Sequence, residues 1–414
     1  MSGPARQTGH AAPVAAWLTV GICALVYFLD GLVHTIMGPL APEFAPALRL
    51  DSAALGPIFS ANLIGQCIGL IALPPVAARY GDRWTVGLCL AGFGVAQAAS
   101  GLMMSGGSLF WMRLVTGVFL GGCLPSCLAM VTAVAPVERR GLAITALFTG
   151  YGLGAAVAGM VAVAFLGLGG WRVAMIAVGA ICLASAAVAL LFLRDVPDPD
   201  AAAGERVPRA SPLALLSRRY RIGTLMLWLV FIALLTISYC LSSWLPVLLV
   251  RLGYDAAFAA VALTIFSFGG IAAALCVGLL IDRFGAVRVL VIFLLISSAL
   301  FLATGLLIST AAALAVRAAL ALCGFFALGA YGGVNVVLAA FYPYALRSTG
   351  IGWAKSVGRI GTVAAPVLIG WGLKAGIAET DILASFAAPA LLSAVALMLF
   401  SVSNRRKAVD EQRG

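Results

Sequence analysis

Long runs of apolar residues, separated by short polar segments, recur along the whole chain. The runs at 173–193 and 289–307 are typical, and neither alternates between apolar and polar positions. A helix that crosses a bilayer needs about 20 mostly apolar residues, whereas a membrane strand alternates over about ten. The pattern predicts an all-α polytopic membrane protein. Twelve transmembrane helices are expected, at 14–40, 53–77, 84–104, 108–135, 141–166, 172–193, 222–250, 257–281, 287–309, 312–341, 348–373 and 382–403.

The composition strengthens this interpretation. Hydrophobic residues make up 63% of the chain and charged residues 10%, and the mean hydropathy is +1.10. A soluble domain averages about 45–50% apolar and about 25% charged residues, so the apolar surplus is expected to face the lipid bilayer. The nine cysteines lie inside the apolar segments without metal-ligand spacing. We therefore expect buried thiols and no cofactor.

The net charge of +11 would suggest nucleic acid as a partner of a soluble protein. Here the basic residues fall in short loops, which indicates membrane topology instead, and no nucleic acid is expected. Arg and Lys are concentrated in every second connection between the apolar segments. Because basic residues favour the cytoplasmic side, we expect these connections and both termini there. The basic connections contain Arg79, Arg83, Arg139, Arg140, 194–221, Arg283, Arg288, Arg347 and 405–413, against Arg49, Arg172, Arg251 and Lys374 opposite.

The longest polar stretch divides the chain into two halves. We expect an N-terminal six-helix bundle at 1–193, a cytoplasmic loop at 194–221, a C-terminal six-helix bundle at 222–404 and a cytoplasmic tail at 405–414. The halves repeat each other. Arg-Tyr-Gly-Asp-Arg at 79–83 follows the second apolar segment, and Asp-Arg-Phe-Gly follows the eighth. Equivalent loops indicate an internal repeat of six helices.

The stretch 278–288, Gly-Leu-Leu-Ile-Asp-Arg-Phe-Gly-Ala-Val-Arg, resembles the major facilitator signature G-x-x-x-D-R-x-G-x-x-R. This resemblance implies two pseudo-repeated bundles, with the substrate site at their interface and alternating access to it. It also implies a conformational latch. In the first-half copy, Pro74 and Ala78 stand where glycine and aspartate are expected. The latch residues would be Asp282, Arg283, Arg79 and Arg83.

Three further stretches resemble a narrower family. They are Leu-Asp-Gly at 29–31 followed by 38–42, the segment 113–140, and the segment 342–366. Together they are similar to the aromatic acid:H+ symporter family, bacterial importers of benzoate-like anions. The resemblance implies a multi-pass protein of the bacterial inner membrane that imports a small organic anion, most of all an aromatic carboxylate, with protons. One departure is Val33, which replaces the second acid of the family's first-span motif.

Three ionisable residues of the first bundle are candidates for proton coupling, since charges inside a membrane are costly and rare. Asp30 is interpreted as a proton carrier, a counter-ion to another span, or a residue of a wet structural region. His34 follows one turn later on the same face. It would relay the proton or donate to substrate, or be a neutral structural histidine. The resemblance gives Arg113 a coupling role, and the alternative is a cation that reaches the membrane surface.

Two cations lie one turn apart in the eleventh segment, namely Lys355 and Arg359. Like charges at this spacing repel each other. Asp30 is the one clear acid inside the spans, so the cavity is expected to be positive and the cargo to be an anion. An arginine holds a carboxylate with two hydrogen bonds, whereas a lysine acts as a point charge. Arg359 is predicted to contact the substrate, and Lys355 either does the same or pairs with Asp30.

Aromatic and amide residues near these segments would complete the substrate site, although helix packing explains each one individually. The candidates are Phe148, Tyr151, Tyr239, Tyr331, Asn335, Trp353 and Gln66, and Asn62 shares a face with Gln66.

Other functions are less consistent with the sequence. Ala155 stands where drug/H+ antiporters of the superfamily carry a proline, which weakens the alternative of an exporter or exchanger of another metabolite or drug. No HExxH, Gly-x-Ser-x-Gly or P-loop motif is present, so no enzyme is expected. A transport-derived sensor would need a soluble signalling domain. We expect a monomer whose partners are the organic anion, protons and lipid.

Overall fold

The computed structural model describes residues 13–136, 139–194 and 212–413. All the regular structure in these residues is helical. The first half contains α1 (Pro13–Thr35), α2 (Met37–Ala47), α3 (Ser52–Ala72), α4 (Pro74–Tyr80), α5 (Asp82–Ser100), α6 (Gly106–Val134) and α7 (Arg140–Phe192). The second contains η2 (Pro212–Leu216), α9 (Arg221–Arg251), α10 (Ala256–Phe284), α11 (Ala286–Leu307), α12 (Ala313–Phe341), α13 (Tyr344–Lys374), α14 (Glu379–Ser385) and α15 (Ala387–Arg413).

The twelve predicted crossings are present. Ten helices of the described chain are long and apolar enough to span a membrane. The shorter α5 is an eleventh, and α7 contains two crossings because Gly169 and Gly170 are non-helical. Gly170 has a φ of 76°, which a glycine adopts without strain.

Two boundaries differ from the prediction. The first apolar segment does not end at residue 40, because a second helix, α2, begins after Ile36 and continues to Ala47. At the other end, α15 continues as a helix through the residues assigned to a tail, up to Arg413. Apolar runs therefore underestimate helix length where the helix extends beyond the hydrocarbon. Most of the predicted loop at 194–221 lies outside the described residues.

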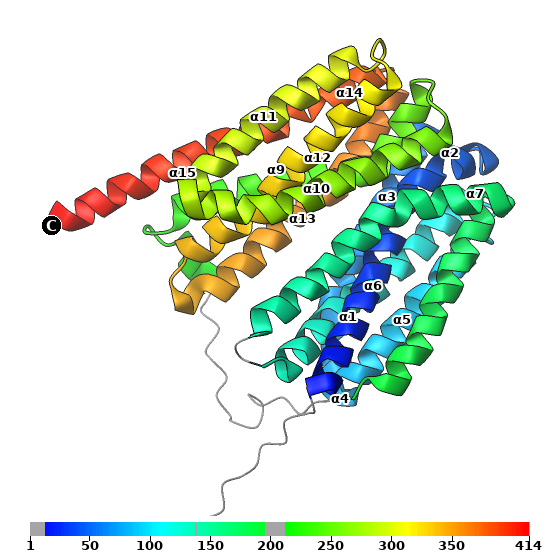
Figure 1. The fold of residues 1–414 in the computed structure, drawn as a ribbon, viewed down its shortest axis with the longest axis horizontal. Helices are drawn as coiled ribbons and strands as arrows, with labels where there is room; N and C mark the ends of the chain where they lie inside the picture. The colour runs from blue at the N-terminus through cyan, green and yellow to red at the C-terminus, as the bar shows by residue number, and fades with distance from the viewer. Residues whose placement is uncertain (1–12, 137–138, 195–211, 414) are drawn as a thin grey trace, which may run out of the picture.

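The two halves form two bundles that meet at one end and diverge at the other (Figure 1). The end where they meet, called the closed end, contains α2, the start of α3 and the loop between α9 and α10. The opposite end, called the open end, contains the start of α1 and the short helix α4. The ribbons of the two bundles are therefore farther apart at the open end than at the closed end, and the space between them is called the gap.

The helices α3 and α13 run antiparallel along the contact between the halves. Gly56 lies against the backbone of Pro366, and its missing side chain permits this approach. Further along, Ser60 Oγ donates a 2.7 Å hydrogen bond to the carbonyl of Val363. Small residues thus bring the two helices together from the closed end to the middle of the membrane.

Charged side chains join the halves at the closed end. Arg251 of the second half forms a 2.6 Å ion pair with Glu379 and donates a 3.0 Å hydrogen bond to Ser52 of the first. Lys374 Nζ lies 2.9 Å from Asp51 Oδ2 across the same boundary. The hydrogen bond from Lys374 holds the pKa of the Asp51 carboxyl below its usual value. The pair is therefore intact at neutral pH and is lost only as the pH falls through that lowered pKa.

Glycines also fix the packing inside the first bundle. A side chain at Gly117 of α6 would meet the carbonyl of Asn62, so α3 and α6 touch through their backbones at this point. The same holds for Gly154 of α7 and the carbonyl of Phe28 in α1. These close approaches fix how α1 and α3, which contain the candidate proton and substrate residues, sit in the bundle.

Candidate functional site

A hydrogen bond joins the two bundles between α3 and α13, farther from the closed end than the contact of Ser60 with Val363. Arg359 of α13 donates from Nη1 to Oε1 of Gln66 in α3 over 3.2 Å. The guanidinium is partly buried. A long basic side chain thus reaches from one half to the other.

The hydrogen-bond network continues into the first bundle through His34. Its Nδ1 lies 2.8 Å from the amide nitrogen of Asn62 and 3.4 Å from that of Gln66. Amide nitrogens only donate, so Nδ1 accepts in this arrangement and the ring proton is assigned to Nε2. Gln66 therefore connects the arginine of one half to the histidine of the other.

Aromatic rings surround His34 from both halves. Tyr239 of α9 packs edge-on at a centroid distance of 4.9 Å, and Tyr151 of α7 lies at 6.5 Å. Tyr27 of α1 connects Tyr151 to Phe148, at 5.9 and 5.7 Å. The result is an aromatic lining beside the polar network. Tyr331 of α12 lies farther into the second half, where its ring is 6.5 Å from that of Phe231.

Lys355 is placed one helical turn from Arg359, toward the open end of the gap. Its side chain is exposed, and Nζ lies 5.9 Å from the centroid of the Phe148 ring in the opposite half. It forms no ion pair with Asp30 or with any other described residue. The structure thus does not show the predicted alternative in which Lys355 is the counter-ion of Asp30.

Asp30 is buried inside the first bundle, with 5% of its surface exposed. Its Oδ1 has no hydrogen-bond partner among the described residues. An ionised carboxylate is costly in a buried position without partners. Taking up a proton removes that cost, which is the chemistry expected of a proton carrier.

Arg113 is fully buried in α6 rather than reaching the membrane surface. Its Nη1 donates to Oε1 of Gln97 in α5 at 2.7 Å, and its Nη2 donates to the carbonyl of Val33 at 3.1 Å. No described acid pairs with it. The arginine therefore contacts the backbone of α1 next to His34, behind the network that faces the gap.

Two predicted substrate residues have other partners. Asn335 donates to the carbonyls of Tyr331 and Gly332 in its own helix, at 3.1 and 3.2 Å. Trp353 stacks on Trp228 at 6.1 Å and is 42% exposed. The structure does not bring either into contact with the network around His34.

The four predicted latch residues lie toward the open end and make their described contacts within their own halves. Arg83 donates to the carbonyl of Leu190 in α7. Arg79 lies over the ring of Tyr80, and Arg283 lies over Phe284. Asp282 is exposed.

Two residues of this region were missed from the sequence. Tyr27 supplies the aromatic link between Tyr151 and Phe148, and Gln97 is the partner of Arg113. The role of Gln97 could have been predicted, since an amide inside an apolar span usually forms a hydrogen bond with another helix. Nothing in the sequence distinguishes Tyr27 from an aromatic residue that only packs between helices.

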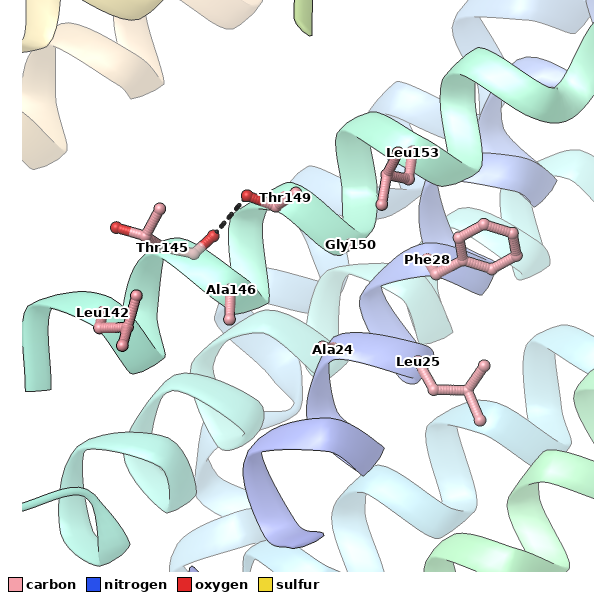
Figure 2. Close-up of a pocket in the computed structure, with 9 residues that line it drawn as sticks. All are labelled: Ala24, Leu25, Phe28, Leu142, Thr145, Ala146, Thr149, Gly150 and Leu153. Atoms are coloured by element: carbon pink, nitrogen blue, oxygen red, sulfur yellow. Dashed lines mark hydrogen bonds between the residues drawn. The ribbon is translucent and has the colours of Figure 1, made fainter. Parts of the chain in front are cut away.

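A groove of about 480 Å³ lies between α1 and the start of α7, separate from this network. Figure 2 shows Ala24, Leu25 and Phe28 facing residues 142–153 across it. Its two hydroxyl groups, those of Thr145 and Thr149, already donate to carbonyls of α7. The groove offers an anion no charge and no free donor.

No cluster of His, Cys, Asp and Glu among the described residues is arranged to hold a metal ion.

Several proteins known as transporters are similar to this chain in sequence over most of their length. The 3-(3-hydroxy-phenyl)propionate transporter of Escherichia coli K12 is 33% identical, over 95% of each chain. The 4-hydroxybenzoate transporter PcaK of Pseudomonas aeruginosa is 30% identical, over 92% of each. The gallate transporter of Pseudomonas putida is 29% identical, over 93% of this chain and 92% of its own.

Solved structures show the same fold at lower identity. A D-xylose-proton symporter superposes with a TM-score of 0.75 and 15% identity, over 94% of this chain and 98% of its own. A bacterial homologue of the human lysosomal transporter Spinster, inward-facing and unoccupied, has a TM-score of 0.72 and 21% identity, over 95% and 96%.

The family model of the Major Facilitator Superfamily matches residues 23–366 and, in a second match, 251–414. These matches span both six-helix bundles and the contact between them, the arrangement that places the His34–Gln66–Arg359 network between two pseudo-repeated halves. With two bundles, twelve crossings and these relatives, the chain is a multi-pass membrane transporter and not an enzyme, and it belongs to the major facilitator superfamily.

Proposed function

We propose that this protein imports an aromatic carboxylate together with protons across the bacterial inner membrane, as a monomer, by alternating access. The observation that carries the proposal is the position of Arg359, whose partly buried guanidinium reaches Gln66 of the opposite half. A carboxylate that entered the gap would meet this guanidinium. Arginine suits this role because its planar fork matches both oxygens of a carboxylate.

The aromatic part of the cargo would lie against the rings around His34. Tyr151 and Phe148 come from one half and Tyr239 from the other, so a ring held among them would touch both bundles. Stacked and edge-to-face contacts favour an aromatic acid over an aliphatic one. Tyr331 would add a hydroxyl group from α12. Asn335 and Trp353, nearer the open end, would contact the substrate at the edge of the site.

The names of the relatives support the same substrate class. They are transporters of gallate, of 4-hydroxybenzoate and of 3-(3-hydroxy-phenyl)propionate. Each of these compounds combines a carboxylate with a hydroxylated aromatic ring. An arginine beside aromatic rings provides for both features.

The proton would bind at Asp30, which is buried without a hydrogen-bond partner for Oδ1 among the described residues. His34, one turn away, would transmit the state of the carboxyl to Gln66 and thereby to Arg359. Arg113, bonded to the carbonyl of Val33, would hold this part of α1 in place. Proton and substrate would thus be coupled through a short series of side chains, from Asp30 past His34 and Gln66 to Arg359.

Alternating access would be a rocking of the bundle at 1–193 against the bundle at 222–404, joined by the loop at 194–221 and followed by the tail at 405–414. With both termini cytoplasmic, the open end faces the cytoplasm. When the open end closes, Asp282, Arg283, Arg79 and Arg83 would come together as the latch of the opposite state.

The closed-end ion pairs give a test of this movement. Replacing both Arg251 and Lys374 by alanine removes the two contacts made by exposed charges across that end. We expect the closed end to open more often, by about two- to fivefold, because exposed ion pairs stabilise only weakly. The measure is the labelling rate of a Ser243→Cys side chain by a membrane-impermeant maleimide. The parent for comparison also contains Ser243→Cys but keeps Arg251 and Lys374, and the protein without that cysteine gives the background.

A matched swap serves as the control for the closed-end test. Asp51→Lys combined with Lys374→Asp keeps this pair with its charges reversed and leaves Arg251 unchanged, so labelling should stay at the rate of the Ser243→Cys parent. Equal labelling in the alanine double variant and its parent would show that these charges do not hold the closed end.

Transport itself is tested with the purified protein in proteoliposomes and radiolabelled 4-hydroxybenzoate. We expect uptake above the external concentration when the lumen is alkaline, and collapse of that uptake on adding a protonophore. An exporter would accumulate the compound only with the pH gradient reversed. An exchanger would require internal substrate and ignore the gradient, so either pattern would overturn proton-coupled import.

A further inference from the structure

Two cations one helical turn apart on α13 each contact a residue of the opposite half, Arg359 through Gln66 and Lys355 through the ring of Phe148. Arg359 is partly buried and bonded to the neutral amide of Gln66, and Lys355 is exposed. Like charges at this spacing repel each other, and each charge inside a membrane protein is costly. An arrangement of this kind is stabilised by a ligand that brings negative charge to both positions.

The described residues do not supply that negative charge. Neither Lys355 nor Arg359 forms an ion pair with any of them, and the Nζ atom of Lys355 lies 5.9 Å from the centroid of the Phe148 ring. Asp30 is buried within the first bundle, and its Oδ1 accepts no hydrogen bond from either cation. A cargo with one carboxylate would neutralise Arg359 and leave Lys355 unpaired.

The two cations start from neighbouring turns of one helix, α13. Residues four apart on a helix have Cβ atoms about 5–6 Å apart. Their long side chains allow both charged groups to reach one ligand that has two negative groups, such as a benzene ring with an anionic substituent on either side. Phe148 lies beside Lys355, so an aromatic ring bridging the two cations would also have an aromatic neighbour.

Building on the proposed function, we propose that the cargo is an aromatic dianion, with one carboxylate held by Arg359 and a second anionic group held by Lys355. Lys355 then determines specificity, since it separates dianions from the monoanions that Arg359 alone would accept. The ammonium group suits a second, less directional contact, because it is a point charge with rotatable donors.

The test compares terephthalate with its monoamide, 4-carbamoylbenzoate, at pH 8 by calorimetric titration of the purified full-length protein. The two ligands have the same shape and differ by one charge. We expect wild-type protein to bind terephthalate at least about tenfold more tightly. In Lys355→Met this ratio should fall to about one or below, while the affinity for the monoamide changes less than about threefold.

Two variants make the comparison specific. Lys355→Arg keeps the cation and should keep the preference for terephthalate. Lys374→Met removes another of the three lysines, at the closed end, where it pairs with Asp51. Any effect of Lys374→Met on the conformational balance should change both affinities by the same factor, so the ratio should stay at the wild-type value.

The outcomes separate this inference from the proposed function. Equal affinities for the two ligands in wild type, or the same ratio in wild type and Lys355→Met, would overturn the dianion while leaving aromatic carboxylate transport in place. Failure of wild type to bind or transport any aromatic acid, 4-hydroxybenzoate included, would overturn the proposed function itself.

Discussion

Replacing Arg359 by alanine is expected to abolish saturable uptake of the aromatic acid and to weaken its binding at least about 30-fold. Truncating one partner of a buried, hydrogen-bonded charge pair costs about 2–5 kcal/mol, and each 1.4 kcal/mol corresponds to a factor of about ten in affinity. The variant also loses the bond to Gln66 that joins the halves. Calorimetric titration and proteoliposome uptake measure the two effects separately.

Two other variants define what the alanine result means. Arg359→Lys should recover only part of the affinity, because a point charge does not replace a planar fork. Arg317→Ala removes another arginine of the second half, one that packs over Phe258 at 4.7 Å, and should leave the affinity unchanged. An Arg359→Ala variant that binds within about twofold of wild type would mean that the carboxylate is held elsewhere.

The second large effect is expected for Asp30→Asn. The amide mimics the protonated carboxyl but can neither release nor rebind a proton. The variant should therefore lose all uphill accumulation driven by a pH gradient. It should retain much of its counterflow activity, since exchange of labelled for unlabelled substrate requires no net proton movement. Both activities are measured in the same proteoliposomes, with and without the imposed gradient.

An exposed acid provides the matched control for this experiment. Asp381 lies in the first turn of α14, and Asp381→Asn makes the same chemical change outside the gap. It should accumulate substrate as the wild type does. If Asp30→Asn still concentrates substrate to the wild-type level, the proton is carried by another group, and His34 becomes the next candidate.

Much of the fold could be predicted from local properties of the chain. Apolar runs of about 20 residues locate the crossings because each helix must satisfy its own backbone hydrogen bonds in lipid. The break at Gly169 and Gly170 follows from the same pattern. The predicted ends at residues 40 and 403 were less accurate, because α2 and α15 continue as helices beyond the apolar runs.

The candidate site was predictable to the extent that it depends on charge in the membrane. Asp30, His34, Arg113, Lys355 and Arg359 stand out because ionisable residues are rare inside apolar spans. The aromatic and amide candidates carried no comparable signal. Tyr239 and Gln66 touch the network, whereas Asn335 bonds its own helix and Trp353 stacks on Trp228.

The sequence by itself determined the number of crossings, the two-part repeat and the excess of cations over acids in the spans, because these depend on composition and periodicity within single segments. Only the tertiary structure decided that Gln66 meets Arg359 across 293 positions of sequence separation, that Arg113 bonds Gln97, and that charges join the halves at the closed end. Such pairings depend on how small residues let particular helices approach. They also depend on which of the alternating conformations the bundles adopt, and neither is encoded in any one segment.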